Sequence, residues 1–320
     1  MAATAWSATP VSPDHFDGGV LMRLNGVHIE DTFAEAFPML GTRLVITADT
    51  PDWVQAAVVS LTGFATSVIA CGCEAAMERV LPPDESPDSR PGAAVLLFAM
   101  SKAELAKQVA RRVGQCVMTC PGTACYAGLR EGAVIPLGNA LRYFGDGWQI
   151  AKRVGSRRYW RIPVMDGEFL CEAATAAVDG VGGGNFIILA ADRRAALAAA
   201  QAAVQAIRKV PGAILPFPGG VVRSGSKIGG KYKGMIASTN TAFCPTLRAA
   251  VPVSLVPEGV ESILELVIDG VSEAAVAAAM RAGITAVADL GAAGGVVSVT
   301  AGNYGGKLGR YQFRLHEVMA

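Results

Sequence analysis

The sequence predicts an α+β fold of two ferredoxin-like (split β-α-β) subdomains that together form a two-lobed α/β sandwich. Three observations lead to this prediction. The 320 residues are enough for two domains, 52% of them are hydrophobic, and strand-like runs alternate with helix-like runs. The alternation gives four β-α-β units, two in each half. A doubly wound parallel sheet is the alternative, but no glycine-rich turn follows the first strand of either half.

In the first half, short apolar runs rich in β-forming residues alternate with longer helix-like runs. The expected strands are 44–48, 67–71, 93–100 and 116–119. The expected helices are 51–61 and 102–113. Thr50 and Ser101 precede these helices, and their hydroxyl groups can accept hydrogen bonds from N–H groups of the first turn. The stretch 82–91 is rich in proline and polar residues and is expected to be an irregular loop.

The second half repeats the pattern and completes the expected domain organisation. Its expected strands are 186–190, 263–268 and 295–300, and its expected helices are 193–209 and 272–282, the latter starting at Ser272. A basic hairpin that turns at Gly155 and Ser156 is expected between the halves. We therefore expect an N-terminal lobe at 23–150, a C-terminal lobe at 151–320, and a mobile N-terminal extension at 1–22 without signal-peptide features.

Charge, hydropathy and cysteine usage argue against several classes of protein. The net charge of +1 is unlike that of a nucleic-acid-binding or membrane-surface protein. No long apolar run predicts a transmembrane span. The seven cysteines are odd in number and have apolar neighbours, which is typical of reduced thiols in a cytoplasmic protein. Their spacing matches no zinc signature, so we expect no metal site.

The most informative segment is residues 216–233, which read P-F-P-G-G-V-V-R-S-G-S-K-I-G-G-K-Y-K. It contains five glycines, two serines and four basic residues. Glycines let backbone N–H groups approach a ligand, and serine and lysine donate to anionic oxygens. The segment therefore predicts a loop that binds phosphates or carboxylates, although it has neither the P-loop nor the Rossmann spacing. A flexible surface loop is the alternative.

A second candidate group is Glu265, within the expected strand S-I-L-E-L-V-I-D-G. Its carboxyl group lies either on the solvent face of the sheet or half-buried with a raised pKa. A further glycine-rich segment, 301–311, carries Asn303, Tyr304 and Lys307, and it is either a ligand-contacting loop or a turn between strands.

Two more segments have a local interpretation as well as a functional one. In residues 28–38, Asp31 or Thr32 could cap a short helix that carries Glu35, or the segment could simply be packed through its phenylalanines. In residues 179–186, three consecutive glycines precede a strand, which indicates a bend or a close approach of two backbones.

Four of the motifs closely resemble those of the formylmethanofuran–tetrahydromethanopterin formyltransferases. They are G-V-H-I-E-D-T-F-A-E-A-F-P, T-G-F-A-T-S-V-I, P-F-P-G-G-V-V-R-S-G-S-K and A-G-N-Y-G-G-K-L-G-R-Y-Q, and the resemblance runs in order from Leu24 to His316. It implies a cytoplasmic enzyme of two ferredoxin-like subdomains. It also implies a homo-oligomer, typically a tetramer, with active clefts at subunit contacts and no permanently bound cofactor or metal.

The additional N-terminal residues and the near-neutral charge resemble the bacterial, methylotroph branch of this family. There, the similar protein is a subunit of a formyltransferase/hydrolase complex whose other subunits hydrolyse the formyl group, so such partners are implied. Residues 71–76 read C-G-C-E-A-A where archaeal members have C-P-A-E-A-G. Glu74 is kept, but family contacts from positions 72 and 73 are not carried over.

The resemblance implies formyl transfer between methanofuran and N5 of tetrahydromethanopterin, two carrier co-substrates, through a tetrahedral intermediate. Glu265 matches a strand glutamate regarded as catalytic in the family. The expected substrate-binding residues are Gly219, Gly220, Arg223, Ser224, Ser226, Lys227, Lys231, Asn303, Tyr304, Lys307, Glu35 and Glu74. One alternative is a non-catalytic, carrier-binding scaffold subunit, and another is a phosphate-binding module for a different pterin or a nucleotide.

Overall fold

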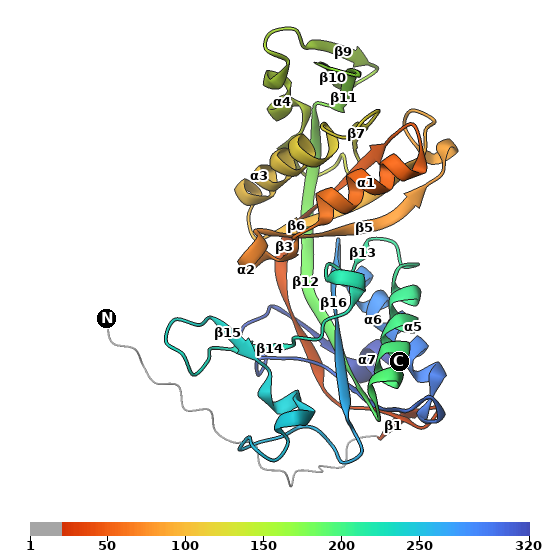
Figure 1. The fold of residues 1–320 in the computed structure, drawn as a ribbon, viewed down its shortest axis with the longest axis vertical. Coiled ribbons are helices and arrows are strands. Elements are labelled where there is room, and N and C mark those ends of the chain that lie inside the picture. The colour runs from red at the N-terminus through yellow and green to blue at the C-terminus, as the bar shows by residue number, and fades with distance from the viewer. Residues whose placement is uncertain (1–20) are drawn as a thin grey trace.

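Two long strands connect the two lobes of the molecule. The computed structural model describes residues 21–320, so the expected mobile extension lies, up to residue 20, outside the described residues. Strand β3 (Phe33–Thr47) and strand β12 (Ala174–Ala190) pair antiparallel, with Phe37 opposite Gly182 and Gly41 opposite Val178. Each strand continues into both lobes, which are stacked along the long axis of the molecule (Figure 1).

The upper lobe in Figure 1 is a sheet with helices on one face. Its strand order is β5-β6-β3-β7, all antiparallel, where β5 is Cys73–Leu81, β6 is Gly92–Ala99 and β7 is Ala124–Ala127. Helices α1 (Pro51–Thr62) and α3 (Lys102–Arg112) bury their apolar residues in one core cluster with these strands. Beyond β7, the sheet continues through β11 (Gly167–Glu172), β10 (Arg157–Val164) and β9 (Ile150–Val154).

The lower lobe repeats this arrangement with the second half of β12. Its order is β13-β16-β12-β17, again antiparallel, where β13 is Ala213–Ile214, β16 is Ser262–Gly270 and β17 is Val296–Thr300. Helices α5 (Arg193–Ile207) and α6 (Glu273–Leu290) cover one face and share its core cluster. The opposite face carries the site described below.

Shorter elements complete the molecule, and some of them pair with strands from a distant part of the chain. They are β1 (Met22–Leu24), β2 (Val27–Ile29), β4 (Thr66–Ser67), α2 (Val68–Cys71), β8 (Ala133–Pro136), α4 (Gly138–Leu141), β14 (Ser226–Ile228), β15 (Ala237–Thr239), β18 (Tyr311–Arg314) and α7 (Leu315–Met319). Strand β2 pairs with β17 of the lower lobe, although it comes from the start of the chain. Strands from both sides of residue 150 thus join in each lobe, and the division into 23–150 and 151–320 stays a prediction.

The structure is a mixed α/β fold built on a large mixed sheet, with parallel pairs only between β17 and β2 and between β11 and β7 among the described strands. The antiparallel order in both lobes disagrees with the doubly wound alternative. The four expected helices are present, and Thr50, Ser101 and Ser272 accept N-capping hydrogen bonds as predicted. The hairpin at Gly155 is also confirmed, because Val154 pairs with Arg157.

Three local predictions are wrong. Of the expected strand 67–71, residues 68–71 form a capped helical turn, because the Ser67 side chain accepts a hydrogen bond from Ile69 and Gly72 ends the turn in a left-handed conformation. Residues 116–119 are not a strand either, since a π-helical turn continues α3 over Val113–Val117. Glu35 lies in β3 and not in a short helix, because this part of β3 pairs with β18.

The glycine run at 179–186 lies where β3 and β12 cross, and the predicted bend is confirmed. The register of β12 against β16 shifts between Val181 and Gly184, which marks a bulge. A Cβ atom at Gly182 would overlap the Met39 sulfur, and one at Gly184 would overlap Val276. The glycines therefore leave room for Met39 of β3 and Val276 of α6 to pack directly on the backbone of β12.

The buried Glu35 carboxylate fixes the C-terminal glycine-rich loop against β3. It accepts hydrogen bonds from the backbone N–H groups of four loop residues at 2.5–2.9 Å, namely Tyr304, Gly306, Leu308 and Gly309. Burial raises the pKa of Glu35, but the four backbone donors lower it more, so this pKa lies below its ordinary value of 4.5. The carboxylate is therefore charged and neutralised by backbone dipoles.

We predict that Glu35→Gln lowers the free energy of unfolding by about 2 kcal/mol or more, because an amide cannot accept from four N–H groups. The lowered pKa means that the contribution of Glu35 is complete above pH 4.5 and is lost as the pH falls through its folded-state pKa. Chemical denaturation at several pH values measures this. Glu317→Gln, at an exposed carboxyl on α7, is the control. The account is contradicted if the difference in free energy of unfolding between wild type and Glu35→Gln stays the same as the pH is lowered.

Candidate functional site

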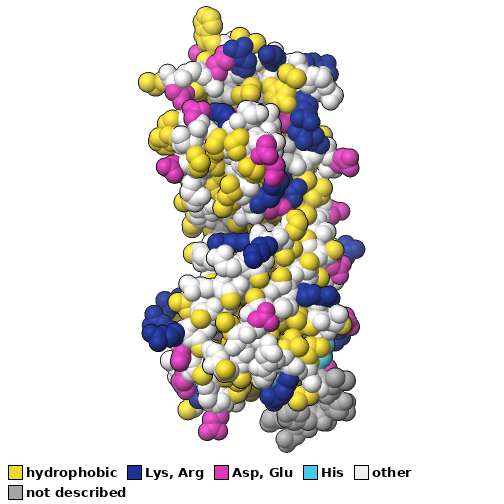
Figure 2. All heavy atoms as spheres, turned by 90° about the vertical axis from the view of Figure 1, so that its right-hand side faces the viewer, with side chains coloured by type: hydrophobic (Ala, Val, Ile, Leu, Met, Phe, Trp, Pro, Cys, Tyr) yellow, Lys and Arg dark blue, Asp and Glu magenta, His cyan; other side chains and the backbone are white. Residues whose placement is uncertain are grey.

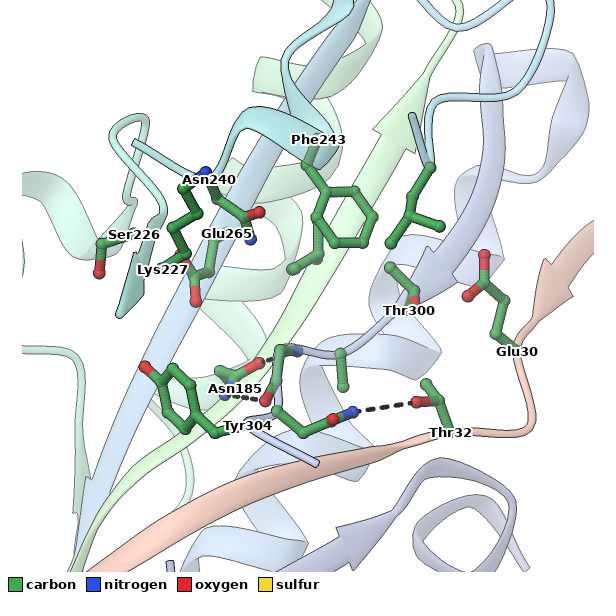
Figure 3. A pocket seen from close by; sticks show the side chains of 15 residues that line it. Glu30, Thr32, Asn185, Ser226, Lys227, Asn240, Phe243, Glu265, Thr300 and Tyr304 are labelled. Carbon is green, nitrogen blue, oxygen red and sulfur yellow. Dashed lines mark hydrogen bonds between the residues drawn. The ribbon is translucent and has the colours of Figure 1, made fainter. Parts of the chain in front are cut away.

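Two cavities open on the face of the lower lobe that lies away from α5 and α6. We call the first the polar cavity, about 370 Å³ in volume, and the second the apolar cavity, about 570 Å³. Four residues line both of them: Asn185, Ser226, Glu265 and Tyr304. Figure 3 shows the polar cavity with Glu265 on one side of it and Asn185 and Tyr304 on the opposite side. The shared residues mark the place where two ligands could meet.

Glu265 occupies the centre of this junction. Its backbone is held on both sides, by Ile187 of β12 and by reciprocal hydrogen bonds of 2.8 and 2.9 Å with Val222. Its side chain points away from the helices, because Leu266, the next residue on β16, packs in the helix-side core. Burial raises the pKa of the Glu265 carboxyl to about 7. This carboxyl can therefore give or take a proton near neutral pH.

Tyr304 is held beside Glu265 by hydrogen bonds to its own backbone N–H group and to Gly302, two residues earlier. The Asn185 side chain bonds both backbone groups of Gly302, accepting from the N–H at 2.6 Å and donating to the carbonyl at 3.1 Å. Glu35 holds the N–H of Tyr304 itself at 2.7 Å. Burial and the negative charges of Glu265 and Glu35 raise the pKa of Tyr304, so its hydroxyl group stays a hydrogen-bond donor.

The polar cavity is lined by one lysine, by amide and hydroxyl groups, and by the carboxyl groups of Glu30 and Glu265. Lys227 reaches it from β14 and donates to the Thr241 hydroxyl at 2.8 Å. Asn303 also lines it and is held by the Phe33 carbonyl at 3.1 Å. Asn240 and Phe243 follow β15 and complete the wall. Such a lining suits a polar ligand, with Lys227 as the place for an acidic group.

The apolar cavity has aromatic and aliphatic walls and acidic groups. Its apolar residues include Phe37, Met39, Val68, Phe217 and Val267. Glu35, Glu74 and Glu265 also line it, while no lysine, arginine or histidine is among its lining residues in the described part of the chain. A flat, nitrogen-rich ring fits such a cavity, because carboxyl groups accept from N–H groups and aromatic faces stack on rings.

The structure brings together most of the residues that the sequence predicts for the site. The cavity-lining ones are Glu265, Ser224, Ser226, Lys227, Asn303, Tyr304, Glu35 and Glu74. Arg223 lines a small neighbouring cavity of about 50 Å³ that also touches Glu265. Gly219 and Gly220 line a different groove, of about 700 Å³, between the lobes. Lys231 and Lys307 line none of these cavities.

Sequence reasoning missed Asn185, Asn240 and Phe243. Asn185 directly follows the three glycines of 179–186, and an amide next to a predicted backbone bend was a signal that could have identified it. Asn240 precedes and Phe243 ends a short 3₁₀ turn after β15, and neither carries a local signal.

The described residues also show how charge and possible metal ligands are distributed. Basic and acidic side chains are interspersed on the face shown in Figure 2, and no single-sign field covers it. No group of three His, Cys, Asp or Glu side chains is placed to hold a metal ion within 21–320. Within the same range, no helix is long and apolar enough to span a membrane.

Comparison with known proteins identifies relatives along nearly the whole chain. Residues 22–164 match the family described as formylmethanofuran-tetrahydromethanopterin formyltransferase, and residues 167–318 match the family described as FTR, proximal lobe. A formylmethanofuran–tetrahydromethanopterin formyltransferase from Methylococcus capsulatus is 60% identical over 299 residues, which cover 93% of this chain and 100% of the relative.

Two solved structures are similar in fold as well as in sequence. A chain of the formyltransferase/hydrolase complex from Methylorubrum extorquens, solved in complex with methylofuran, has a TM-score of 0.92 and 53% identity, over 94% of this chain and 99% of that chain. The formylmethanofuran:tetrahydromethanopterin formyltransferase from Methanosarcina barkeri has a TM-score of 0.88 and 44% identity, over 93% and 100%. The chain belongs to the formylmethanofuran–tetrahydromethanopterin formyltransferase family.

Proposed function

We propose that this chain transfers a formyl group directly between N5 of tetrahydromethanopterin and the amine of methanofuran, as a step of formaldehyde oxidation in one-carbon metabolism. The relatives carry names that describe this reaction. The observation that carries the proposal is the position of Glu265, a buried carboxyl with a pKa of about 7, at the junction of two cavities. A transferase for two carriers needs two binding places that meet at one acid–base group.

The proposed chemistry uses only groups that line the junction. The acceptor amine attacks the formyl carbon, and the carbonyl electron pair moves onto oxygen to give a tetrahedral intermediate. The Tyr304 hydroxyl group donates to this oxyanion. The protonated Glu265 carboxyl gives its proton to the leaving nitrogen as the carbon–nitrogen bond breaks. The resulting carboxylate then takes the proton from the attacking nitrogen, which restores the carboxyl group and balances the reaction.

We further propose that each cavity holds the reacting end of one carrier. The apolar cavity has the ring-stacking walls, and the polar cavity has Lys227, which suits an acidic tail. Holding two reactants in register accounts for a large part of the rate of such a reaction, because it replaces an encounter in solution. No covalent enzyme intermediate and no permanent cofactor is part of this mechanism.

The strand order in each lobe supports a ferredoxin-like class for both. Counted along the chain, the four strands of each lobe lie in the order second, third, first, fourth across the sheet.

We also propose a homo-oligomer. Strands β14 and β15 form a separate two-stranded sheet that projects from the body, and Ile228, Tyr232 and Ile236 on it are exposed (Figure 1). Such a hairpin needs an apolar partner surface for stability.

Further partners and the location of the chain are proposed from its relatives and its thiols. The solved formyltransferase/hydrolase complex contains a chain similar to this one, so we propose that other subunits of such a complex bind here too. The seven cysteines are free thiols, which supports a cytoplasmic location.

We predict that Glu265→Gln lowers kcat for formyl transfer about 100-fold or more, because the amide cannot exchange the proton. Purified variants are assayed with both carriers, and circular dichroism and native mass check the fold and assembly. Glu258→Gln, at an exposed carboxyl before β16, is the matched control. Near-wild-type turnover in Glu265→Gln contradicts the proposed role.

The pH profile gives a second expectation for the same group. Because the protonated form of Glu265 starts the reaction, kcat should fall as the pH rises through about 7, and this inflection should be absent in Glu265→Gln. The measurement is kcat against pH under saturating carriers, within the range where the protein stays folded.

We predict that Lys227→Ala raises KM for one carrier about tenfold while changing kcat less, because its ammonium group contacts an acidic tail and not the reacting atoms. Lys102→Ala, on the exposed start of α3, is the control. Steady-state kinetics with each carrier varied in turn distinguish the two constants. A fall in kcat with unchanged KM argues instead for a role of Lys227 at the reacting centre.

A further inference from the structure

A pair of carboxyl groups, one fully buried and one partly buried, joins the two lobes at the apolar cavity. Glu74 comes from β5 of the upper lobe and Asp269 from β16 of the lower lobe. Their carboxyl groups are close enough that each alters the pKa of the other. Asp269 is 0% exposed, and Glu74 lines the cavity. The pair is distinct from Glu265, which lies four residues away on the same strand and face, about 13 Å along β16.

The other hydrogen bonds of the pair identify its state. Glu74 accepts from the Val68 N–H at 3.0 Å, and Asp269 Oδ1 accepts from the Gly183 N–H at 3.1 Å. Asp269 Oδ2 is buried and has no N–H or hydroxyl donor among the described residues. Its remaining neighbour is the Glu74 carboxyl. Two carboxyl groups can form a hydrogen bond only when one of them carries a proton.

On the side that faces the apolar cavity, the pair meets no positive charge that would replace this proton. The lining residues of the apolar cavity include no lysine, arginine or histidine in the described part of the chain. The charged and titratable groups of neighbouring elements on the cavity side are the carboxyl groups of Glu35 and Glu265 and the Tyr304 hydroxyl. On β5 and next to it they are the thiols of Cys71 and Cys73, the Arg112 guanidinium that acts on Cys73, and the ion pair of Glu78 with Arg43. Burial and the neighbouring Glu74 raise the pKa of Asp269 well above its ordinary value. Like charges this close cannot both ionise at low cost.

From Asp269, a chain of hydrogen bonds leads to the reacting centre. Asp269 holds Gly183 in the bulge of β12, and the Gly183 carbonyl accepts from the Asn185 side chain at 3.2 Å. Asn185 in turn holds Gly302, two residues before Tyr304. The position of Tyr304 relative to Glu265 therefore depends on the bulge that Asp269 fixes.

We propose that Glu74 and Asp269 form a carboxyl pair that shares one proton across the cleft and positions, through Gly183 and Asn185, the loop that carries Tyr304. Both are positioning residues and not catalytic residues. Loss of the shared proton leaves two adjacent carboxylates, which repel each other and loosen the junction between the lobes. The proposal rests on the proposed function only for its activity readout, whereas its stability readout is independent of what the enzyme does.

Asp269→Asn is the variant that tests the shared proton. Its amide keeps the bond from Gly183 and can donate to the Glu74 carboxylate at any pH, so no shared proton is needed. The relevant pH range lies between the ordinary pKa values of the two carboxyl groups and their raised values in the folded protein. In this range the folded wild type binds more protons than the unfolded chain, so its stability falls as the pH rises. The thermal midpoint of the full-length assembly is measured from pH 5.5 to 9.

We expect the midpoint of the wild type to fall more steeply with pH than that of Asp269→Asn. Glu74→Gln should show the same flattened slope, because its amide donates to Asp269. Asp289→Asn, at an exposed carboxyl on α6, is the matched control and should keep the wild-type slope. Equal slopes in the wild type and in both pair variants overturn the shared proton.

The activity arm tests the positioning role. Asp269→Ala leaves the Gly183 N–H unpaired, so it should lower kcat/KM about tenfold, mainly through kcat, while Asp269→Asn restores most of this loss. Unchanged kcat/KM in Asp269→Ala, or an equal loss in the Asn variant, overturns the role. If Asp269→Ala does not fold, the pH slopes of the thermal midpoints of Asp269→Asn and Glu74→Gln, compared with that of the wild type, still test whether the pair shares a proton. Failure of the Glu265 assignment would leave the slopes of the thermal midpoints unaffected.

Discussion

The geometry of the whole site depends on the buried Glu35 carboxylate. Four backbone N–H groups of the 304–309 loop converge on its two oxygens, so a single side chain of β3 fixes a long glycine-rich segment with no secondary structure of its own. Charge-assisted bonds of this kind are stronger than neutral ones, and burial removes the competing water. Tyr304 is presented to Glu265 as a result. Glu35, expected to touch substrate, lines the apolar cavity and at the same time holds its wall.

Strands β3 and β12 explain why such a loop can serve a cleft between two lobes. Each strand belongs to both lobes, so the sheet of one lobe is fixed relative to the other without a flexible linker. Glycines at the crossing allow close packing, and the bulge beside them carries Asn185. Glu78 adds a second interlobe contact by accepting from Arg43 and from the Gly212 N–H. The cavities that meet at Glu265 are a consequence of this rigid crossing.

Local periodicity predicted the helices, their caps and the strand around Glu265, because these depend on residues close in sequence. It could not predict that 68–71 and 116–119 are helical, since short apolar runs fit either state until their neighbours are known. The place of Glu35 in β3 depends on pairing with residues almost 280 positions later. Similarly, Asp269 and Glu74 meet only through tertiary packing. Sequence motifs did identify the segments that line the cavities, because glycine-rich loops and a charged residue in an apolar strand are visible locally.

The central claim is that one junction, formed by this chain, transfers the formyl group directly from one carrier to the other. The most direct measurement supplies the purified chain alone with both carriers, one of them bearing a formyl group labelled with ¹³C and ¹⁸O. The account predicts that the product formyl group keeps both labels, because the oxyanion oxygen never exchanges with water. Transfer that loses ¹⁸O, or that requires added partner subunits, would contradict direct transfer at Glu265.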